Sequence, residues 1–318
     1  LTRSESSSFI SESETEILIP QRPILDVMIG RDGLVRKIHR RILDKRSILI
    51  KGLPGSGKTL FLQHIYAYAK ERGEEVYFVS LQGILGSTEA ERKLAQELNQ
   101  SELCLSDFQD SIFIVDACAV DLSSTLSKWF EQVASCSWIV SSRSSISKLS
   151  VEEIDLQPLS IEDSVELFTT LLPDHTNFST GEEFPFLKWS HKLEGNPYLI
   201  TQMVRRLIGE IKPEQVQAII KESREDWFNL LRSELNRELL CVECLQQLSI
   251  FEGPFSLEAA EAVVSPNTDE TVWVMDLVAQ LLDRSFLYLV KPRGNEIHTE
   301  KRFSFSKNVR LFALSIKM

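Results

Sequence analysis

Residues 52–59 read Gly-Leu-Pro-Gly-Ser-Gly-Lys-Thr, which satisfies the phosphate-loop pattern G-x-x-x-x-G-K-[ST] in full. Residues 47–51 before it form a short apolar run that suits a buried strand. After it, Phe61, Ile65 and Tyr68 recur at helical spacing. The pattern binds phosphate in this strand–loop–helix context, because the glycines let backbone N–H groups surround the anion and the helix N-terminus faces it. We therefore predict a nucleotide-binding loop, with a plain glycine-rich turn as the alternative.

The loop also supplies two side chains with suitable chemistry. The Lys58 ammonium is expected to reach the β- and γ-phosphates, and the Thr59 hydroxyl is expected to bind Mg²⁺. The predicted ligand is ATP or ADP with Mg²⁺. From the loop and the start of its helix, we expect nucleotide contacts from Pro54, Gly55, Ser56, Gly57, Lys58, Thr59 and Leu60.

Two further apolar segments lead into a charged residue. Residues 112–115 precede Asp116, whose carboxylate would hold Mg²⁺ through water. Residues 138–142 precede Arg143, an always-charged donor that would sense the γ-phosphate. We predict that Lys58, Asp116 and Arg143 are the catalytic residues and that Thr59 and Asp116 serve the metal. The alternatives are a surface acid at a turn and a solvated arginine.

Strand-like and helix-like segments alternate up to residue 156, which predicts an α/β P-loop NTPase with a parallel sheet covered by helices on both faces. The predicted strands are 47–51, 75–81, 111–116, 137–142 and 152–156, and the predicted helices among them are 32–43, 58–71, 88–99 and 122–134. After Pro158 helices dominate, including separate helices at 213–224 and 226–236. Two strand-like runs at 286–291 and 302–306 then flank a turn and favour a winged helix.

These patterns divide the chain into a linker and three domains. The predicted divisions are a flexible Ser/Glu-rich linker at 1–19, a P-loop nucleotide-binding domain at 20–157, an all-α lid domain at 158–225 and a winged-helix domain at 226–318.

Charge and cysteine content limit the partners and the compartment. The net charge of -11 argues against wholesale binding to nucleic acid or to an anionic membrane, and no apolar run reaches the length of about 18 residues that a membrane span needs. Five cysteines, an odd number, indicate reduced thiols and a cytoplasmic protein. Residues 284–318 nevertheless carry eight basic and two acidic residues, so a DNA-binding winged helix stays open as an alternative function.

The ordered motifs resemble those of the signal-transduction ATPases with numerous domains (STAND), especially their NB-ARC branch. Beyond the phosphate loop and Asp116, the matching segments are Met28–Asp32, Ile139–Arg143, Ile154–Ser160, Glu166–Phe168, Leu193–Pro197, Leu248–Ala262 and Arg302–Met318. The resemblance implies that Ile29 and Gly30 border the adenine, that Arg31 helps to hold the nucleotide, and that Pro197 packs near the base. It identifies Arg143 as the sensor arginine.

The resemblance also implies a function. Such proteins are switches in signalling, including defence responses, with a closed ADP-bound monomer and an ATP-bound state that self-associates. Effector and sensor domains, which the family usually carries, are not visible in this chain. An inert scaffold that holds nucleotide only for stability is a further alternative.

The chain departs from the NB-ARC pattern at two positions. Asp116 is followed by Ala117, Cys118 and Ala119 in place of a group that activates water, so we expect slow hydrolysis or none. Ser306 occupies the position of a family histidine that contacts the ADP β-phosphate, so that contact is not expected here.

Overall fold

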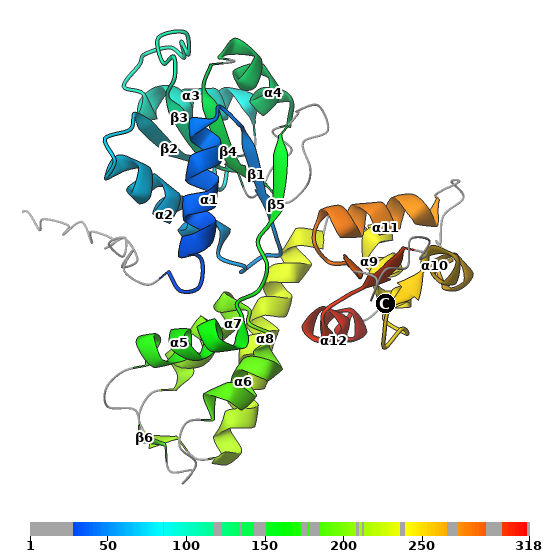
Figure 1. The fold of residues 1–318 in the computed structure, drawn as a ribbon. Helices are drawn as coiled ribbons and strands as arrows, with labels where there is room; N and C mark the ends of the chain where they lie inside the picture. Colours follow the sequence, from blue (N-terminus) through cyan, green and yellow to red (C-terminus); the bar gives the residue numbers. More distant parts are fainter. Residues whose placement is uncertain are drawn as a thin grey trace, which may run out of the picture.

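The structure is a computed structural model of the chain. It describes residues 28–84, 86–117, 123–133, 135–142, 151–172, 177–178, 185–207, 210–211, 213–235, 239–265, 273–290 and 301–316. The predicted linker at 1–19 and the predicted sensor Arg143 lie outside these residues. Three regions are visible in Figure 1: a sheet domain, a helical region centred on α5 to α8, and a C-terminal region from α9 to α12.

A five-stranded parallel sheet forms the centre of the first region, as the sequence predicts. Its strands are β1 (Ile48–Lys51), β2 (Val76–Ser80), β3 (Ile112–Asp116), β4 (Ser137–Ser141) and β5 (Glu152–Asp155), in the spatial order β2-β3-β4-β1-β5. All neighbouring strands pair in parallel. The phosphate loop, which follows β1, and Asp116, which ends β3, therefore lie at the same carboxyl edge of the sheet, where ligands of such sheets bind.

Helices cover both faces of this sheet, which confirms the predicted layering. Ile48 and Ile50 point to one face, where they pack with α1 (Asp32–Leu43) and α2 (Lys58–Lys70). Leu49, between them, belongs to the core on the other face, with α3 (Ser87–Glu97) and α4 (Ser123–Gln132). The strands alternate between two covered faces, which explains why β1, β3 and β4 are buried along their whole length.

The helical region consists of α5 (Ile161–Leu171), α6 (Phe186–Leu193), α7 (Pro197–Arg206) and α8 (Pro213–Leu235), with a short parallel pair of β6 (Asn177–Phe178) and β7 (Glu210–Ile211). The prediction of separate helices at 213–224 and 226–236 was wrong, because α8 is continuous. No glycine or proline interrupts it after Pro213, and Ser223 Oγ donates to Ile219 O at 2.8 Å within the helix. The domain boundary predicted at 225 therefore falls inside a helix.

The C-terminal region combines helices with a small antiparallel sheet. Its elements are α9 (Leu239–Leu248), β8 (Phe255–Ser256), α10 (Leu257–Val263), α11 (Val274–Asp283), β9 (Tyr288–Val290), β10 (Arg302–Ser304) and α12 (Lys307–Ser315). The two predicted strands pair as β9 and β10, while β8, the third strand, was not predicted. A strand of two residues leaves no periodic signal in a sequence.

One hydrophobic core joins the helical and C-terminal regions. It includes Leu199 and Trp227 from the helical region and Leu245 and Phe312 from the C-terminal region. The rings of Phe228 on α8 and Phe312 on α12 lie 5.5 Å apart. In Figure 1, α8 runs from the helical region up to the C-terminal region. The two regions are therefore expected to unfold together.

We predict that Phe228→Ala lowers the free energy of unfolding by about 3–5 kcal/mol, because it leaves a cavity at the junction of the two regions. Leu314→Ala is the control, since Leu314 also lies on α12 but is 55% exposed. Urea unfolding followed by far-UV circular dichroism should show the helices of both regions shifting together. Separate transitions, with only one of them shifted, would contradict the shared core.

Candidate functional site

The phosphate loop leaves β1 and turns into α2 through three glycines with positive φ. Gly52, Gly55 and Gly57 have φ angles of 148°, 79° and 87°, and Gly57 is the N-cap of α2. Residues other than glycine rarely adopt such backbone angles, which explains why glycine occupies these three positions. The loop therefore holds its backbone in a tight curve directly before the N-terminus of α2, where an anion is stabilised by the helix dipole.

Lys58 lies buried inside this curve. Its Nζ donates to Gly52 O at 2.6 Å and to Leu53 O at 3.1 Å, so the ammonium closes the loop upon itself. A phosphate bound in the loop would compete with these carbonyl oxygens for the same cation. A charge-assisted contact to phosphate is stronger than one to a neutral carbonyl.

Asp116, at the end of β3, is fully buried and accepts hydrogen bonds from residues of α2, of β4 and of the segment after β2. Thr59 Oγ1 donates to its Oδ2 at 2.7 Å, and Ser141 Oγ donates to its Oδ1 at 2.5 Å. The Gln82 amide, just beyond β2, donates to Asp116 Oδ2 at 2.9 Å and to Thr59 Oγ1 at 3.1 Å. The structure thus brings Thr59 and Asp116 together, as the sequence predicts.

Gln82 and Ser141 were not predicted from the sequence. Both residues lie at or just after the carboxyl ends of strands adjacent to β3. Knowledge of the strand order would have identified them, because neighbouring parallel strands end at one edge. Together with Thr59 and Asp116 they form a set of oxygen and amide groups, and such oxygens are the ligands that Mg²⁺ prefers.

The segment from Ile29 to Arg31 contacts both the phosphate loop and the helical region. Ile29 belongs to the core of the helical region. A Cβ on Gly30, whose φ is 73°, would collide with the carboxylate of Asp163 on α5. The Arg31 guanidinium is 3.1 Å from the Cβ position of Gly57 and donates to Gln157 O at 3.1 Å.

Arg31 therefore provides a second cation beside the loop. Burial lowers its pKa to about 10, partly offset by the charge of Asp163. At neutral pH the guanidinium stays charged.

The helical region touches the tip of the phosphate loop directly. Tyr198 N donates to Gly55 O at 3.2 Å, and Trp227 Nε1 donates to Pro54 O at 2.9 Å. A Cβ on Gly55 would lie 2.6 Å from Tyr198 Cβ. Pro197, predicted to lie near the base, is the first residue of α7 and immediately precedes Tyr198.

Ser56 indicates how well the loop suits a phosphate. Its side-chain oxygen is buried inside the loop and has no hydrogen-bond partner among the described residues. Buried hydroxyl groups normally have a partner, so this one is available to a phosphate oxygen. Together with the glycine curve, Lys58 and the Thr59–Asp116 pair, it fits a nucleotide phosphate and its metal ion.

The carboxyl edge of the sheet also contacts the C-terminal region. Lys51, the residue directly before the loop, forms ion pairs with Glu153 on β5 at 2.9 Å and with Asp283 at the end of α11 at 3.2 Å. Burial alone would lower the pKa of Lys51, but the two carboxylates outweigh it and raise the pKa. The Lys51 ammonium beside the loop is thus paired with one carboxylate of the ATPase domain and one of the C-terminal region.

A second contact links the helical and C-terminal regions. The Glu194 carboxylate accepts hydrogen bonds from Lys307 N and Asn308 N, both at 2.7 Å, and so caps the start of α12. Ser306, at the position of the family histidine, is the N-cap of the same helix and accepts from Val309 N at 3.2 Å. In this arrangement its side chain stabilises α12.

Arg143, the predicted sensor, lies outside the described residues, and so do Cys118 and Ala119, which follow Asp116 and Ala117 in the chain. Ala117 is buried, and its backbone N–H donates to Ser141 O at 3.2 Å. Its methyl side chain cannot activate water.

Residues 27–156 match the family described as "ATPase: KaiC". They comprise the sheet, the phosphate loop and Asp116. Residues 27–156 form a KaiC-type P-loop ATPase domain. This domain binds nucleotide. No curated protein sequence matches the chain.

Solved structures extend the fold likeness beyond this domain. The Walker-type ATPase of Pyrococcus abyssi has a TM-score of 0.58 at 12% identity, covering 91% of this chain and 96% of its own. At that identity the likeness establishes a shared fold.

Two other solved structures have lower TM-scores. A STAND protein of Pyrococcus horikoshii with a tetratricopeptide repeat sensor has a TM-score of 0.38 at 13% identity, covering 93% of this chain and 44% of its own. The Orc1 protein of Aeropyrum pernix, in complex with DNA, has a TM-score of 0.43 at 15% identity, covering 91% and 93%. None of the described helices has the length and apolar content to cross a membrane.

We predict that Gly55→Ala lowers the free energy of unfolding by about 2–3 kcal/mol, because it adds a collision with Tyr198 to the strain of a positive φ. Gly73→Ala is the matched control. Its φ of 76° is similar, but a Cβ there meets nothing within 4 Å. It should cost about 1 kcal/mol. If urea unfolding showed equal losses of unfolding free energy for the two variants, the contact between the loop and the helical region would contribute nothing to stability.

Proposed function

We propose that this protein is a nucleotide-controlled switch of the STAND type, resembling the NB-ARC branch. ATP or ADP binds in the phosphate loop, and the nucleotide state sets how the helical and C-terminal regions sit on the ATPase domain. The helical region acts as the lid and the C-terminal region as the winged-helix domain. The ATP-bound form self-associates.

The observation that carries this proposal is the ion pair of Lys51 with Asp283. Lys51 directly precedes Gly52 in the chain, and Asp283 belongs to the C-terminal region. A change in the loop that moves Lys51 therefore changes a contact between regions. Nucleotide can shift such an arrangement only if it binds the two states unequally, and a γ-phosphate in the loop supplies a difference of this kind.

The nucleotide-contacting residues in this proposal are those expected from the sequence. Pro54 to Leu60 surround the phosphates, and Lys58 exchanges its hydrogen bonds to the loop carbonyl oxygens for contacts to them. Thr59 and Asp116 hold Mg²⁺, with Gln82 and Ser141 orienting the Asp116 carboxylate. Bound Mg²⁺ neutralises charge on the phosphate oxygens. Ile29, Arg31 and Pro197 border the rest of the nucleotide, and Arg143 faces the γ-phosphate.

Slow hydrolysis belongs to the same proposal. Rapid hydrolysis needs a residue that orients or deprotonates the attacking water. Ala117 lacks such a group, and every described hydrogen bond of the Gln82 amide goes to Asp116 or Thr59. A protein that keeps its nucleotide intact for a long time suits a switch, because its state then follows nucleotide exchange.

DNA binding by the C-terminal region remains the less favoured function. Residues 241–283 contain eight acidic residues and no basic one, so helices from that part would present negative charge to the DNA phosphates. Asp283 is already paired with Lys51. The described contacts therefore favour docking within the chain.

We predict that Lys58→Ala weakens ADP and ATP binding at least tenfold, because it removes a charge-assisted contact to the phosphates. Isothermal titration with Mg²⁺ present measures the affinity, and acid extraction of the purified protein identifies any retained nucleotide. Lys70→Ala, at the exposed end of the same helix, is the control. If Lys58→Ala bound nucleotide as tightly as the native chain, the loop would not be the binding site.

A further inference from the structure

We propose that Trp227 is a positioning residue of the phosphate loop. Its indole N–H fixes the Pro54–Gly55 peptide and thereby the direction of the Gly55 N–H, so that phosphate affinity depends on the docked helical region. The proposal rests on the proposed function, since it assumes that the loop binds nucleotide phosphates.

Trp227 holds a single peptide group of the phosphate loop, the one between Pro54 and Gly55. Trp227 Nε1 donates to Pro54 O at 2.9 Å, and the Trp227 side chain is buried. The described peptide bonds include no cis bond. In a planar trans peptide the C=O and the N–H point in opposite directions. Holding the Pro54 carbonyl therefore turns the Gly55 N–H away from Trp227 and fixes that donor, and such N–H groups are what a phosphate loop offers to phosphate.

The next peptide of the loop is held in a similar way. Tyr198 N donates to Gly55 O at 3.2 Å and is shared with Asn196 Oδ1 at 3.0 Å. The Ser56 N–H, on the other side of that peptide, donates to Leu53 O at 3.1 Å and closes the turn. Because the Tyr198 N–H is divided between two acceptors, the undivided bond from Trp227 is the stronger of the two contacts.

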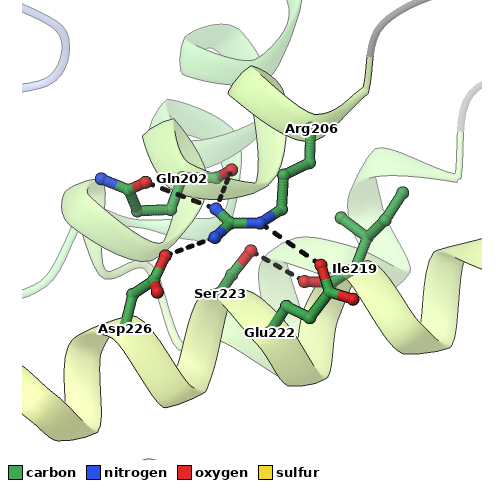
Figure 2. A network of polar contacts seen from close by, with 6 residues as sticks. All are labelled: Gln202, Arg206, Ile219, Glu222, Ser223 and Asp226. Carbon is green, nitrogen blue, oxygen red and sulfur yellow. Dashed lines mark hydrogen bonds and ion pairs between the residues drawn. The ribbon is translucent and has the colours of Figure 1, made fainter.

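A polar network links α7, which carries Tyr198, to α8, which carries Trp227. As Figure 2 shows, Arg206 reaches from α7 to α8, where its Nη2 contacts Asp226 Oδ2 at 2.5 Å and its Nε lies 3.5 Å from Glu222 Oε2. Arg206 Nη1 also donates to Gln202 O at 3.1 Å. Asp226 precedes Trp227 in the chain, so the helix that begins beside Gly55 and the helix that carries Trp227 are fastened to each other.

A purely structural role for Trp227 predicts a different result from a positioning role. If the indole only fills space, its loss weakens the binding of every ligand by the same factor. If its N–H orients the Gly55 donor, the loss falls on ligands whose phosphates enter the loop. ADP has a β-phosphate to place there, whereas AMP does not.

The test is titration of the full chain with ADP and with AMP, in the native form and as Trp227→Phe. The substitution keeps an aromatic ring and removes the N–H. ADP affinity should fall by about 2- to 12-fold, the range that one net hydrogen bond accounts for, while AMP affinity should not change. Trp129→Phe is the control, because Trp129 is equally buried and its Nε1 has no hydrogen-bond partner among the described residues.

Unchanged ADP affinity in Trp227→Phe, or an equal loss for ADP and AMP, would overturn the positioning role while leaving nucleotide binding intact. Failure of the native chain to bind ADP would instead overturn the proposed function, and this inference with it. Should Trp227→Phe fail to fold by circular dichroism, Asp226→Asn decides, because it removes the ion pair with Arg206. It should lower ADP affinity by a smaller factor and leave AMP affinity unchanged, and any other result contradicts the proposal.

Discussion

The close approach of the helical region to Gly55 is the contact on which the arrangement of the three regions depends. A side chain at this position would collide with Tyr198, and the backbone angle of the loop would be strained as well. Because Gly55 has no side chain, backbone and indole N–H groups reach the loop carbonyl oxygens. The glycine thus serves the curve of the phosphate loop and the docking of a second region at once.

The described polar contacts that the ATPase domain makes with the other two regions are individually modest. They include the two hydrogen bonds to the loop tip and the Lys51–Asp283 ion pair. A net hydrogen bond contributes about 0.5–1.5 kcal/mol. A nucleotide that binds two arrangements with affinities differing by a few kcal/mol is therefore sufficient to change the balance between them.

The sequence predicted the ATPase domain well because its signals are local. Strands such as 112–116 are apolar on both faces, and α1 has the predicted bounds of 32–43. The sequence predicted less where a role depends on distant partners. Gln82 and Ser141 required the strand order, and Trp227 is 173 residues from the carbonyl that it contacts. The break predicted between 224 and 226 is absent, and Asp226 in the continuous α8 pairs with the distant Arg206 on α7.

The most direct test of the switch compares the chain with ADP and with a non-hydrolysable ATP analogue, each with Mg²⁺, by small-angle X-ray scattering. The radius of gyration and the forward-scattering mass are the quantities to measure. Our account predicts a compact monomer with ADP and, with the ATP analogue, a larger radius and a mass above that of one chain. Identical radius and mass with both nucleotides, each bound at saturation, would contradict the switch and leave a scaffold that holds nucleotide only for stability.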